Sequence, residues 1–239
     1  MTTFNLNSTP AQACFDAAAP DLGDAHPHER EGARRALNVA AAVVGLVVAS
    51  PVMLCIAIAI KLTSPGPVFF KQTRIGLDVR RSTGGNHRRR QDLGGRPFTL
   101  YKFRTMRAEA PGKGSQVWAS KGDPRVTSIG RFLRVTRLDE LPQLWNVLLG
   151  HMNVVGPRPE QPVIFQNLRN EVTGYALRQR VRPGITGNAQ ITLHYDTCID
   201  DVRKKVAADL EYIEGQSVME DLRIMLLTAP AVIWRKGGW

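Results

Sequence analysis

Two adjacent carboxylates, Asp139 and Glu140, are the residues of this 239-residue chain whose types and surroundings most clearly suggest chemistry. Arg134 and Arg137 precede them in the chain. Carboxylates bind Mg²⁺ together with substrate phosphates, and an aspartate can itself attack phosphorus. Arginines and a metal ion would stabilise charge on the phosphoryl oxygens of a transition state. The pair therefore predicts phosphoryl chemistry on an anionic substrate, with Asp139 and Glu140 as candidate Mg²⁺ ligands.

The residues that follow the pair predict a helix that begins near Asp139 and stops at Gly150. Pro142 is tolerated in a first turn, and Gly150 suits the left-handed position just beyond a helix. The carboxylates would then lie at the helix end whose N–H groups favour anions. An alternative interpretation is that Asp139 caps this helix and Glu140 merely complements its dipole.

Basic side chains dominate the composition. The net charge is +11, and the stretch from Lys71 to Arg107 holds eleven Lys or Arg but two acids. The preferred partners are therefore anionic: nucleic acid, a phosphorylated substrate or an acidic membrane surface. Nucleic acid is disfavoured because aromatic residues are only 7% of the chain and the loop 79–95 contains none. The three cysteines show no metal-ligand or disulfide spacing.

Several basic residues stand where the backbone would present them toward an anion. The alternating segment 98–103 predicts a strand that delivers Lys102 and then Arg104. Arg158 lies between two prolines, which hold it on a rigid, extended backbone. Arg182 lies in another turn. Together with Arg134 and Arg137, these side chains would surround the acidic pair.

An uncharged segment of 25 residues, 36–60, would be about 37 Å long as a helix, enough to cross a ~30 Å hydrocarbon core. Pro51 interrupts it, and Ser50 is a candidate donor to the carbonyl that the proline frees. Cations flank both ends, as is typical of cytoplasmic flanks. These features favour a re-entrant hairpin on the cytoplasmic face. A kinked single span and a buried soluble helix are the alternatives.

The remaining patterns predict an α/β fold, mostly helical with a small sheet. Short strands are expected at 68–70 and 98–103, and helices at 196–214 and 218–234, the last one amphipathic and suited to a membrane interface. The expected organisation is a disordered tail (1–30), a re-entrant membrane helix (31–62) and a cytoplasmic catalytic domain (63–239), interrupted by a basic Gly- and Arg-rich insertion (79–95).

Six motifs occur in this order: K-x-x-S-P-G-P-V-F-F from Lys61, Q-x-R-I-G from Gln72, K-F-R-T-M from Lys102, L-D-E-L-P-Q from Leu138, V-G-P-R-P-E from Val155 and R-P-G-I-T-G from Arg182. With them, the chain resembles the bacterial sugar transferase family, the monotopic phosphoglycosyl transferases, over about residues 34–235. The insertion departs from the family pattern and leaves the motifs intact. We expect it to contact the membrane or a partner.

The resemblance implies transfer of a sugar-1-phosphate from a nucleoside diphosphate sugar, usually a UDP-sugar, to a polyprenol phosphate such as undecaprenyl phosphate. UMP would be released, in the first membrane step of exopolysaccharide, capsule, O-antigen or glycoconjugate synthesis. Asp139 would attack the β-phosphorus and form a covalent phosphosugar intermediate. Glu140 would assist metal binding or activate the polyprenol phosphate, and Mg²⁺ would bridge Asp139 and the diphosphate.

The resemblance also assigns further residues. The substrate-binding candidates are Lys102, Arg104, Arg134, Arg137, Pro157, Arg158, Pro159, Arg182, Asp209 and Asp221. Ser50 and Pro51 match the helix-breaking pair of a re-entrant membrane helix, which places the enzyme on the cytoplasmic face of the bacterial inner membrane. Larger family members add transmembrane helices, so this chain is expected to be the minimal catalytic form. The sugar and the oligomeric state, a homo-oligomer included, stay open.

A different class of protein competes with this interpretation. A non-catalytic basic protein that binds anionic lipid would use the Arg-rich insertion and the amphipathic C-terminus, and would need neither carboxylate. A phosphatase or a multi-span transferase acting on polyprenyl phosphates is a second alternative. The multi-span form would need many apolar spans, and this sequence has one.

Overall fold

The computed structural model describes residues 28–78, 94–107, 123–193 and 198–234. Over these residues the chain is mostly helical and carries two small two-stranded sheets, as the sequence predicted in outline. The elements are α2 (His28–Thr63), β1 (Phe69–Ile75), β2 (Pro97–Phe103), α3 (Ser128–Val135), η1 (Leu138–Glu140), α4 (Gln143–Leu148), β3 (Asn153–Val155), α5 (Pro162–Glu171), η2 (Tyr175–Arg180), β4 (Gly184–Thr186), α6 (Asn188–Thr192), α7 (Ile199–Gly215) and α8 (Val218–Trp234). Residues 1–27 of the expected tail and nearly all of the expected insertion lie outside the described residues, and residues 28–30 belong to α2.

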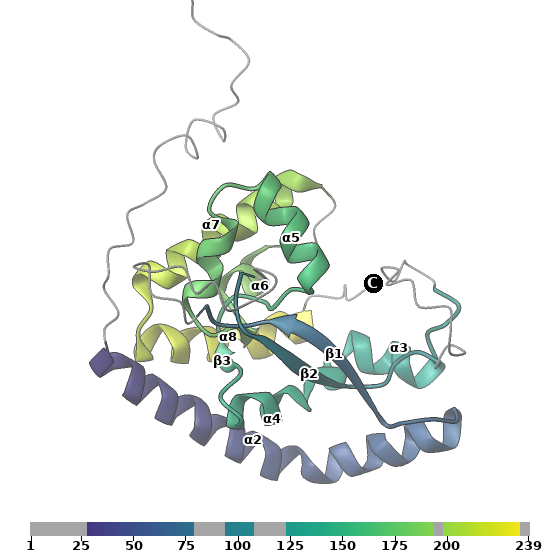
Figure 1. Cartoon of the computed structure of the whole chain (residues 1–239). Helices are drawn as coiled ribbons and strands as arrows, with labels where there is room; N and C mark the ends of the chain where they lie inside the picture. Colours follow the sequence, from purple (N-terminus) through teal and green to yellow (C-terminus); the bar gives the residue numbers. More distant parts are fainter. Residues whose placement is uncertain (1–27, 79–93, 108–122, 194–197, 235–239) are drawn as a thin grey trace, which may run out of the picture.

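The long helix α2 continues through Pro51 and is not divided into two helices. Figure 1 shows it bowed, with the rest of the molecule on its concave side. Proline removes the hydrogen bond to the carbonyl four residues earlier, that of Val47. The hydroxyl of Ser50 donates to this same carbonyl over 2.8 Å, as the sequence predicted. The helix thus bends without leaving the acceptor unsatisfied, and the hairpin topology stays a proposal.

One face of α2 packs on the molecule, and its other face is apolar and exposed. Arg34, Asn38, Ala42, Ile56 and Ile60 are buried. The large exposed hydrophobic residues of this helix are Val43, Val44, Val47, Val48, Val52, Leu54, Ile58 and Leu62. Within the described part of the chain, the segment Glu31–Thr63 is the one helix long and apolar enough to cross a membrane.

The two small sheets fix the position of the segments that follow their strands. Strands β1 and β2 pair antiparallel, with Phe70 opposite Lys102 and Ile75 opposite Pro97. The short strands β3 and β4 pair in parallel, with Val155 opposite Thr186. A Cβ atom on Gly184 would lie 2.1 Å from the backbone nitrogen of Gly156, so this contact requires glycine. The close pairing places the segment after β3 directly beside β4.

The acidic pair lies in a 3₁₀ turn, η1, and not at the start of an α-helix as predicted. Pro142 has no N–H to offer the carbonyl of Leu138, and the N–H of Leu141 bonds to that carbonyl instead, over 3.3 Å. The helix α4 begins only at Gln143 and has six residues. Gly150 follows it with a φ of 79°, in the predicted left-handed conformation.

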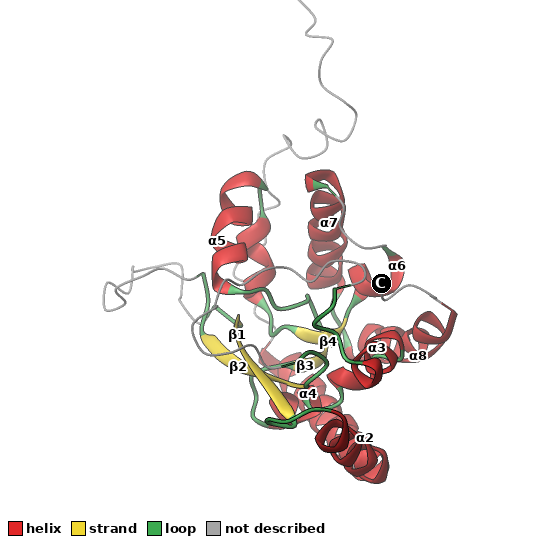
Figure 2. Cartoon of the chain, turned by 90° about the vertical axis from the view of Figure 1, so that its right-hand side faces the viewer, coloured by secondary structure: helices red, strands yellow, loops and turns green. Residues whose placement is uncertain are grey.

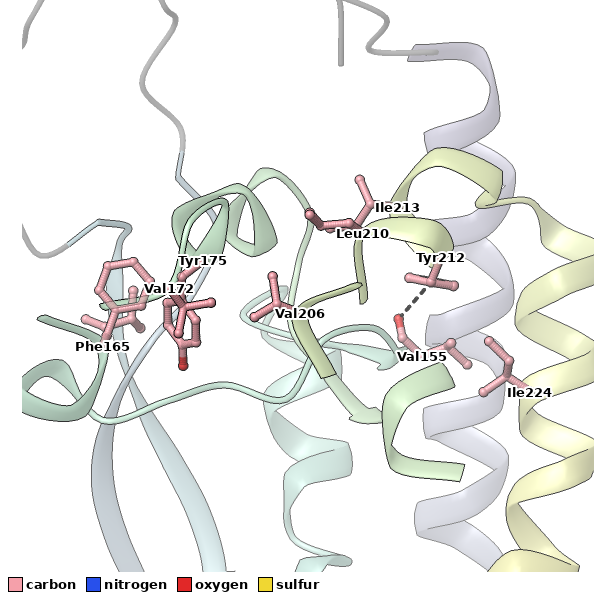
Figure 3. Packing of buried hydrophobic residues seen from close by; sticks show 10 residues of the cluster. Val155, Phe165, Val172, Tyr175, Val206, Leu210, Tyr212, Ile213 and Ile224 are labelled. Atoms are coloured by element: carbon pink, nitrogen blue, oxygen red, sulfur yellow. Dashed lines mark hydrogen bonds between the residues drawn. The ribbon is translucent and has the colours of Figure 1, made fainter. Parts of the chain in front are cut away.

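A large apolar core joins α5, η2, α7 and α8 to strands β1 and β3. Phe165 of α5, Tyr175 of η2 and Val206 of α7 are fully or almost fully buried in it. Figure 3 shows this cluster extending to Val155 and to Ile224 of α8. Figure 2 shows α5 and α7 side by side at the end of the molecule opposite α2. The predicted helices 196–214 and 218–234 correspond to α7, which begins at Ile199, and α8.

Candidate active site

Three segments bring a cluster of charges together around η1. The carboxylate of Glu140 accepts hydrogen bonds at Oε1 from Nζ of Lys102 (2.8 Å) and from Nη2 of Arg158 (3.0 Å). Nη1 of Arg137 lies 3.9 Å from the same oxygen. Lys102 comes from β2, Arg158 from the loop after β3, and Arg137 directly precedes η1. Three of the predicted phosphate-binding residues therefore meet at one predicted catalytic residue.

The neighbouring carboxylate has a different environment. Asp139 is buried, with 8% of its surface exposed, and accepts no hydrogen bond or ion pair from the described residues. Burial raises the pKa of Asp139, and the adjacent Glu140 carboxylate raises it further. Burial alone would also raise the pKa of Glu140, but Lys102, Arg158 and Arg137 outweigh it and hold that pKa well below its usual range. The two carboxylates are thus electrostatically distinct, and Asp139 is the one left available to a ligand.

The backbone before the pair is left-handed at a residue other than glycine. Arg137 has a φ of 58°, which costs about 1–2 kcal/mol for an L-residue with a Cβ atom. This conformation turns the chain from α3 into η1 and leaves the Arg137 side chain beside Glu140. Strained backbone of this kind gathers at functional sites.

Arg104, Arg134 and Arg182, also predicted to bind substrate, have other contacts. Arg104 is 6% exposed and donates to the carbonyl and hydroxyl of Ser64. Arg134 donates from Nε to the Thr105 hydroxyl over 2.9 Å. Arg182 donates to the carbonyl of Gly150 (3.2 Å), and it also forms an ion pair with Glu31 of α2. In this structure Arg104 holds the turn after α2, and Arg182 joins α2 to the end of α4.

The two acidic residues predicted in the C-terminal part lie in buried ion pairs. Asp209 is 2% exposed and pairs with Arg178 over 2.7 Å. Asp221 is fully buried and accepts from Nε of Arg34 (3.0 Å) and from the Tyr212 hydroxyl (2.6 Å). Both carboxylates are thus buried and paired, and their predicted role in substrate binding stays a prediction.

Sequence reasoning missed three arginines that organise the site. Arg74, from the Q-x-R-I-G motif, donates to the carbonyl of Pro159 over 3.0 Å. Arg178 donates to the carbonyl of Arg158 over 3.2 Å. Arg35 donates to the carbonyl of Val147 over 2.6 Å and so covers the end of α4. Arg74 stood in a recognised motif, which was a usable signal, whereas Arg35 was interpreted only as a charge flanking a membrane helix.

A divalent cation is compatible with the carboxylates present. Within the described residues no group of three or more His, Cys, Asp or Glu side chains gathers. Mg²⁺ is commonly held by one or two carboxylates together with substrate phosphates. Asp139 is buried and accepts no hydrogen bond or ion pair from the described residues, which suits it as a ligand. Glu140 is less available because two cations already occupy its Oε1.

Comparison with known proteins shows to which family this chain belongs. A family model described as "Bacterial sugar transferase" matches residues 29–235. The chain is 44% identical over 198 residues to the UDP-glucose:undecaprenyl-phosphate glucose-1-phosphate transferase of Escherichia coli K12, covering 82% of this chain and 39% of that protein. It is 41% identical over 202 residues to the protein of the same name from Caulobacter vibrioides, covering 84% of this chain and 69% of that protein.

A third relative is matched over nearly its whole length. The exopolysaccharide production protein PSS of Rhizobium leguminosarum is 37% identical over 214 residues, which cover 86% of this chain and 98% of that protein. The chain spans about two fifths of the length of the Escherichia coli relative. The protein belongs to the bacterial sugar transferase family, which confirms the resemblance that the six motifs carried.

Proposed function

We propose that this protein transfers a sugar-1-phosphate from a nucleoside diphosphate sugar, a UDP-sugar, to a polyprenol phosphate. The observation that carries the proposal is the unequal environment of the acidic pair. Glu140 is held by cations, whereas Asp139 is buried beside them and accepts no hydrogen bond from the described residues. The printed names of the relatives, UDP-glucose:undecaprenyl-phosphate glucose-1-phosphate transferases, support this reaction.

The proposed reaction has two displacement steps at one phosphorus atom. A carboxylate oxygen of Asp139 attacks the β-phosphorus of the UDP-sugar, the bond from this phosphorus to the bridging oxygen breaks, and UMP leaves with the electron pair. A phosphate oxygen of the polyprenol phosphate then attacks the same phosphorus. The bond to Asp139 breaks, and the products are polyprenyl-diphosphate-sugar and the regenerated carboxylate.

The cationic side chains around η1 have the charge that this reaction requires. Lys102, Arg137 and Arg158 lie beside Glu140, the neighbour of the proposed nucleophile, and would stabilise negative charge on the phosphoryl oxygens. Asp139, with Glu140 beside it, would hold Mg²⁺ together with the diphosphate. When bound, the cation would neutralise charge on the phosphate oxygens. Glu140 would meanwhile keep the cationic side chains in place between turnovers.

The membrane is the proposed site of action. The exposed apolar face of α2 would insert into lipid, with Arg34 and Arg35 at one end of the uncharged segment and Lys61 at the other. We propose that both ends stay on the cytoplasmic face of the bacterial inner membrane, where nucleotide sugars are available. The product would enter polysaccharide or glycoconjugate assembly, in line with the printed name of the Rhizobium relative.

The test is UMP release by detergent-solubilised protein supplied with Mg²⁺, undecaprenyl phosphate and a panel of UDP-sugars. The wild type should release UMP with at least one sugar, and Asp139→Asn should release none. Without undecaprenyl phosphate, the wild type should release no more than one UMP per protein, and its intact mass should rise by one sugar-phosphate. Folded wild type that is inactive with every sugar would instead support a membrane-binding protein without catalysis. Activity that survives Asp139→Asn would keep the reaction and reject the nucleophile.

A further inference from the structure

The loop that carries Arg158 is fixed at four consecutive carbonyl groups. The carbonyl of Pro157 accepts from the N–H of Gly184 (2.9 Å), and that of Glu160 accepts from the N–H of Ile75 (2.9 Å). The two carbonyls between them accept from side chains: Arg158 from Nη2 of Arg178 (3.2 Å), and Pro159 from Nη1 of Arg74 (3.0 Å). Strands β1 and β4 and the turn η2 therefore all hold this one loop.

The Arg178 side chain is itself fixed by two further residues. It is 6% exposed, its Nε donates to Oδ2 of Asp209 over 2.7 Å, and its guanidinium carbon lies 4.9 Å from the centre of the Tyr175 ring. Burial alone would lower the pKa of Arg178, but Asp209, Tyr175 and Glu160 together outweigh burial and raise it. The guanidinium stays charged and in a single orientation because an ion pair and an aromatic ring fix it.

We infer that Arg178 and Asp209 are positioning residues that act through Arg158, with Arg74 assisting from the other side of the loop. The chain of contacts runs from Asp209 on α7 to Arg178 on η2, then to the Arg158 backbone, and from the Arg158 side chain to Glu140. Asp209 is thereby given a role that needs no contact with substrate. The inference rests on the proposed function, since Arg158 matters here as a phosphate-binding group.

The substitution that isolates this role is Arg178→Lys. A lysine keeps the charge opposite Asp209, but its single ammonium lacks the planar fork that reaches Asp209 and the Arg158 carbonyl together. We expect kcat/KM to fall about 100-fold, the loss typical of a reactive group misplaced by about 1 Å. Arg203→Lys is the matched control, because Arg203 pairs with Asp200 on the exposed surface of α7. Its activity should equal that of the wild type.

A double-mutant cycle separates positioning from general damage. In an Arg158→Ala background, Arg178→Lys should lower kcat/KM by less than about 3-fold further, because the group that it positions is already gone. An equal loss in both backgrounds would overturn the inference, as would full activity of folded Arg178→Lys. If Arg178→Lys does not fold, Asp209→Asn takes its place in the cycle.

Hydrogen exchange measures the positioning without any reaction. The peptide 153–165 should exchange faster in Arg178→Lys and Asp209→Asn than in the wild type and in Arg203→Lys. Unchanged exchange would overturn the inference even if activity fell. A wild type inactive with every UDP-sugar would reject the proposed function and the catalytic part of the inference together, whereas an active wild type beside a fully active Arg178→Lys would reject the inference alone.

Discussion

Nζ of Lys102 lies 2.8 Å from Oε1 of Glu140, and this ion pair joins the end of β2 to the turn η1. Both side chains are largely buried, with 17% and 9% of their surfaces exposed. Asp139, the next residue in the chain, is as buried as Glu140 but receives no such partner from the described residues. Because the two carboxylates differ in this way, we expect neutralising Glu140 and neutralising Asp139 to have opposite effects on the stability of the fold.

Glu140→Gln should destabilise the protein. The substitution leaves Lys102 and Arg158 close together without their shared anion, and removing one partner of a buried ion pair costs about 3 kcal/mol or more. Thermal unfolding in detergent should show a lower Tm, and UMP release should fall as well. The control is Glu220→Gln, because Glu220 pairs with exposed Arg223 on α8 and surface pairs contribute little. An unchanged Tm in Glu140→Gln would contradict the prediction.

The pH dependence of stability should change in Glu140→Gln. The folded pKa of Glu140 lies below its unfolded value of about 4.3. Its contribution to the free energy of unfolding is therefore full above about pH 4.3 and is lost as pH falls through the folded pKa. The Tm difference between wild type and Glu140→Gln should consequently shrink in acid. A difference that is constant from pH 7 to the lowest pH at which both proteins fold would refute this linkage.

Asp139→Asn should stabilise the fold while abolishing activity. The pKa of Asp139 is raised by burial and by Glu140, so folding opposes its ionisation. The cost is absent below the unfolded pKa of about 3.9, grows as pH rises towards the folded pKa, and is complete above that value. A gain of about 1 kcal/mol at neutral pH would raise Tm by ~2–4 °C. A lower Tm at neutral pH would show that Asp139 has a stabilising partner.

Asp221→Asn should affect stability rather than substrate affinity. Asp221 is fully buried against Arg34 of α2 and Tyr212 of α7, and it therefore joins the long helix to α8. Its neutralisation leaves the Arg34 guanidinium buried without a counter-charge, which costs about 3–5 kcal/mol. The expected result is a lower Tm and a smaller folded fraction, with an unchanged KM for the UDP-sugar. A raised KM at unchanged Tm would instead support the substrate-binding role predicted from the family motif.

Val48→Lys should weaken attachment to membranes. Val48 lies on the apolar face of α2 and is 70% exposed. A lysine at the centre of a membrane-embedded helix costs roughly 2.5–3.5 kcal/mol. Flotation with phosphatidylethanolamine–phosphatidylglycerol vesicles should recover less of this variant than of the wild type. Glu211→Lys is the control, because Glu211 is an exposed residue of α7. This substitution changes the net charge more than Val48→Lys does, and the variant should still float with the vesicles like the wild type. Equal recovery of Val48→Lys would place this face outside the lipid.

Local sequence was sufficient for several features of this protein. Two of them, the hydrogen bond from Ser50 to the Val47 carbonyl and the left-handed conformation of Gly150, follow from short-range backbone chemistry. The strand that carries Lys102 is also local, because side-chain alternation sets it. The family could be recognised from motif order alone, and the matching model confirms it.

The tertiary structure decided which charges meet. The sequence favoured Arg134, Arg158 and Arg182 over Arg104 and Arg137 as phosphate-binding residues. The fold instead brings Arg137 and Arg158 to Glu140, whereas Arg104 and Arg182 contact other partners. The pairing of Asp209 with Arg178 and of Asp221 with Arg34 spans 31 and 187 residues of sequence. Ion pairs of this kind depend on packing between distant elements and on burial. Neither can be inferred from the spacing of residues along the sequence. For that reason the sequence identified the two carboxylates, but only the fold made them chemically different.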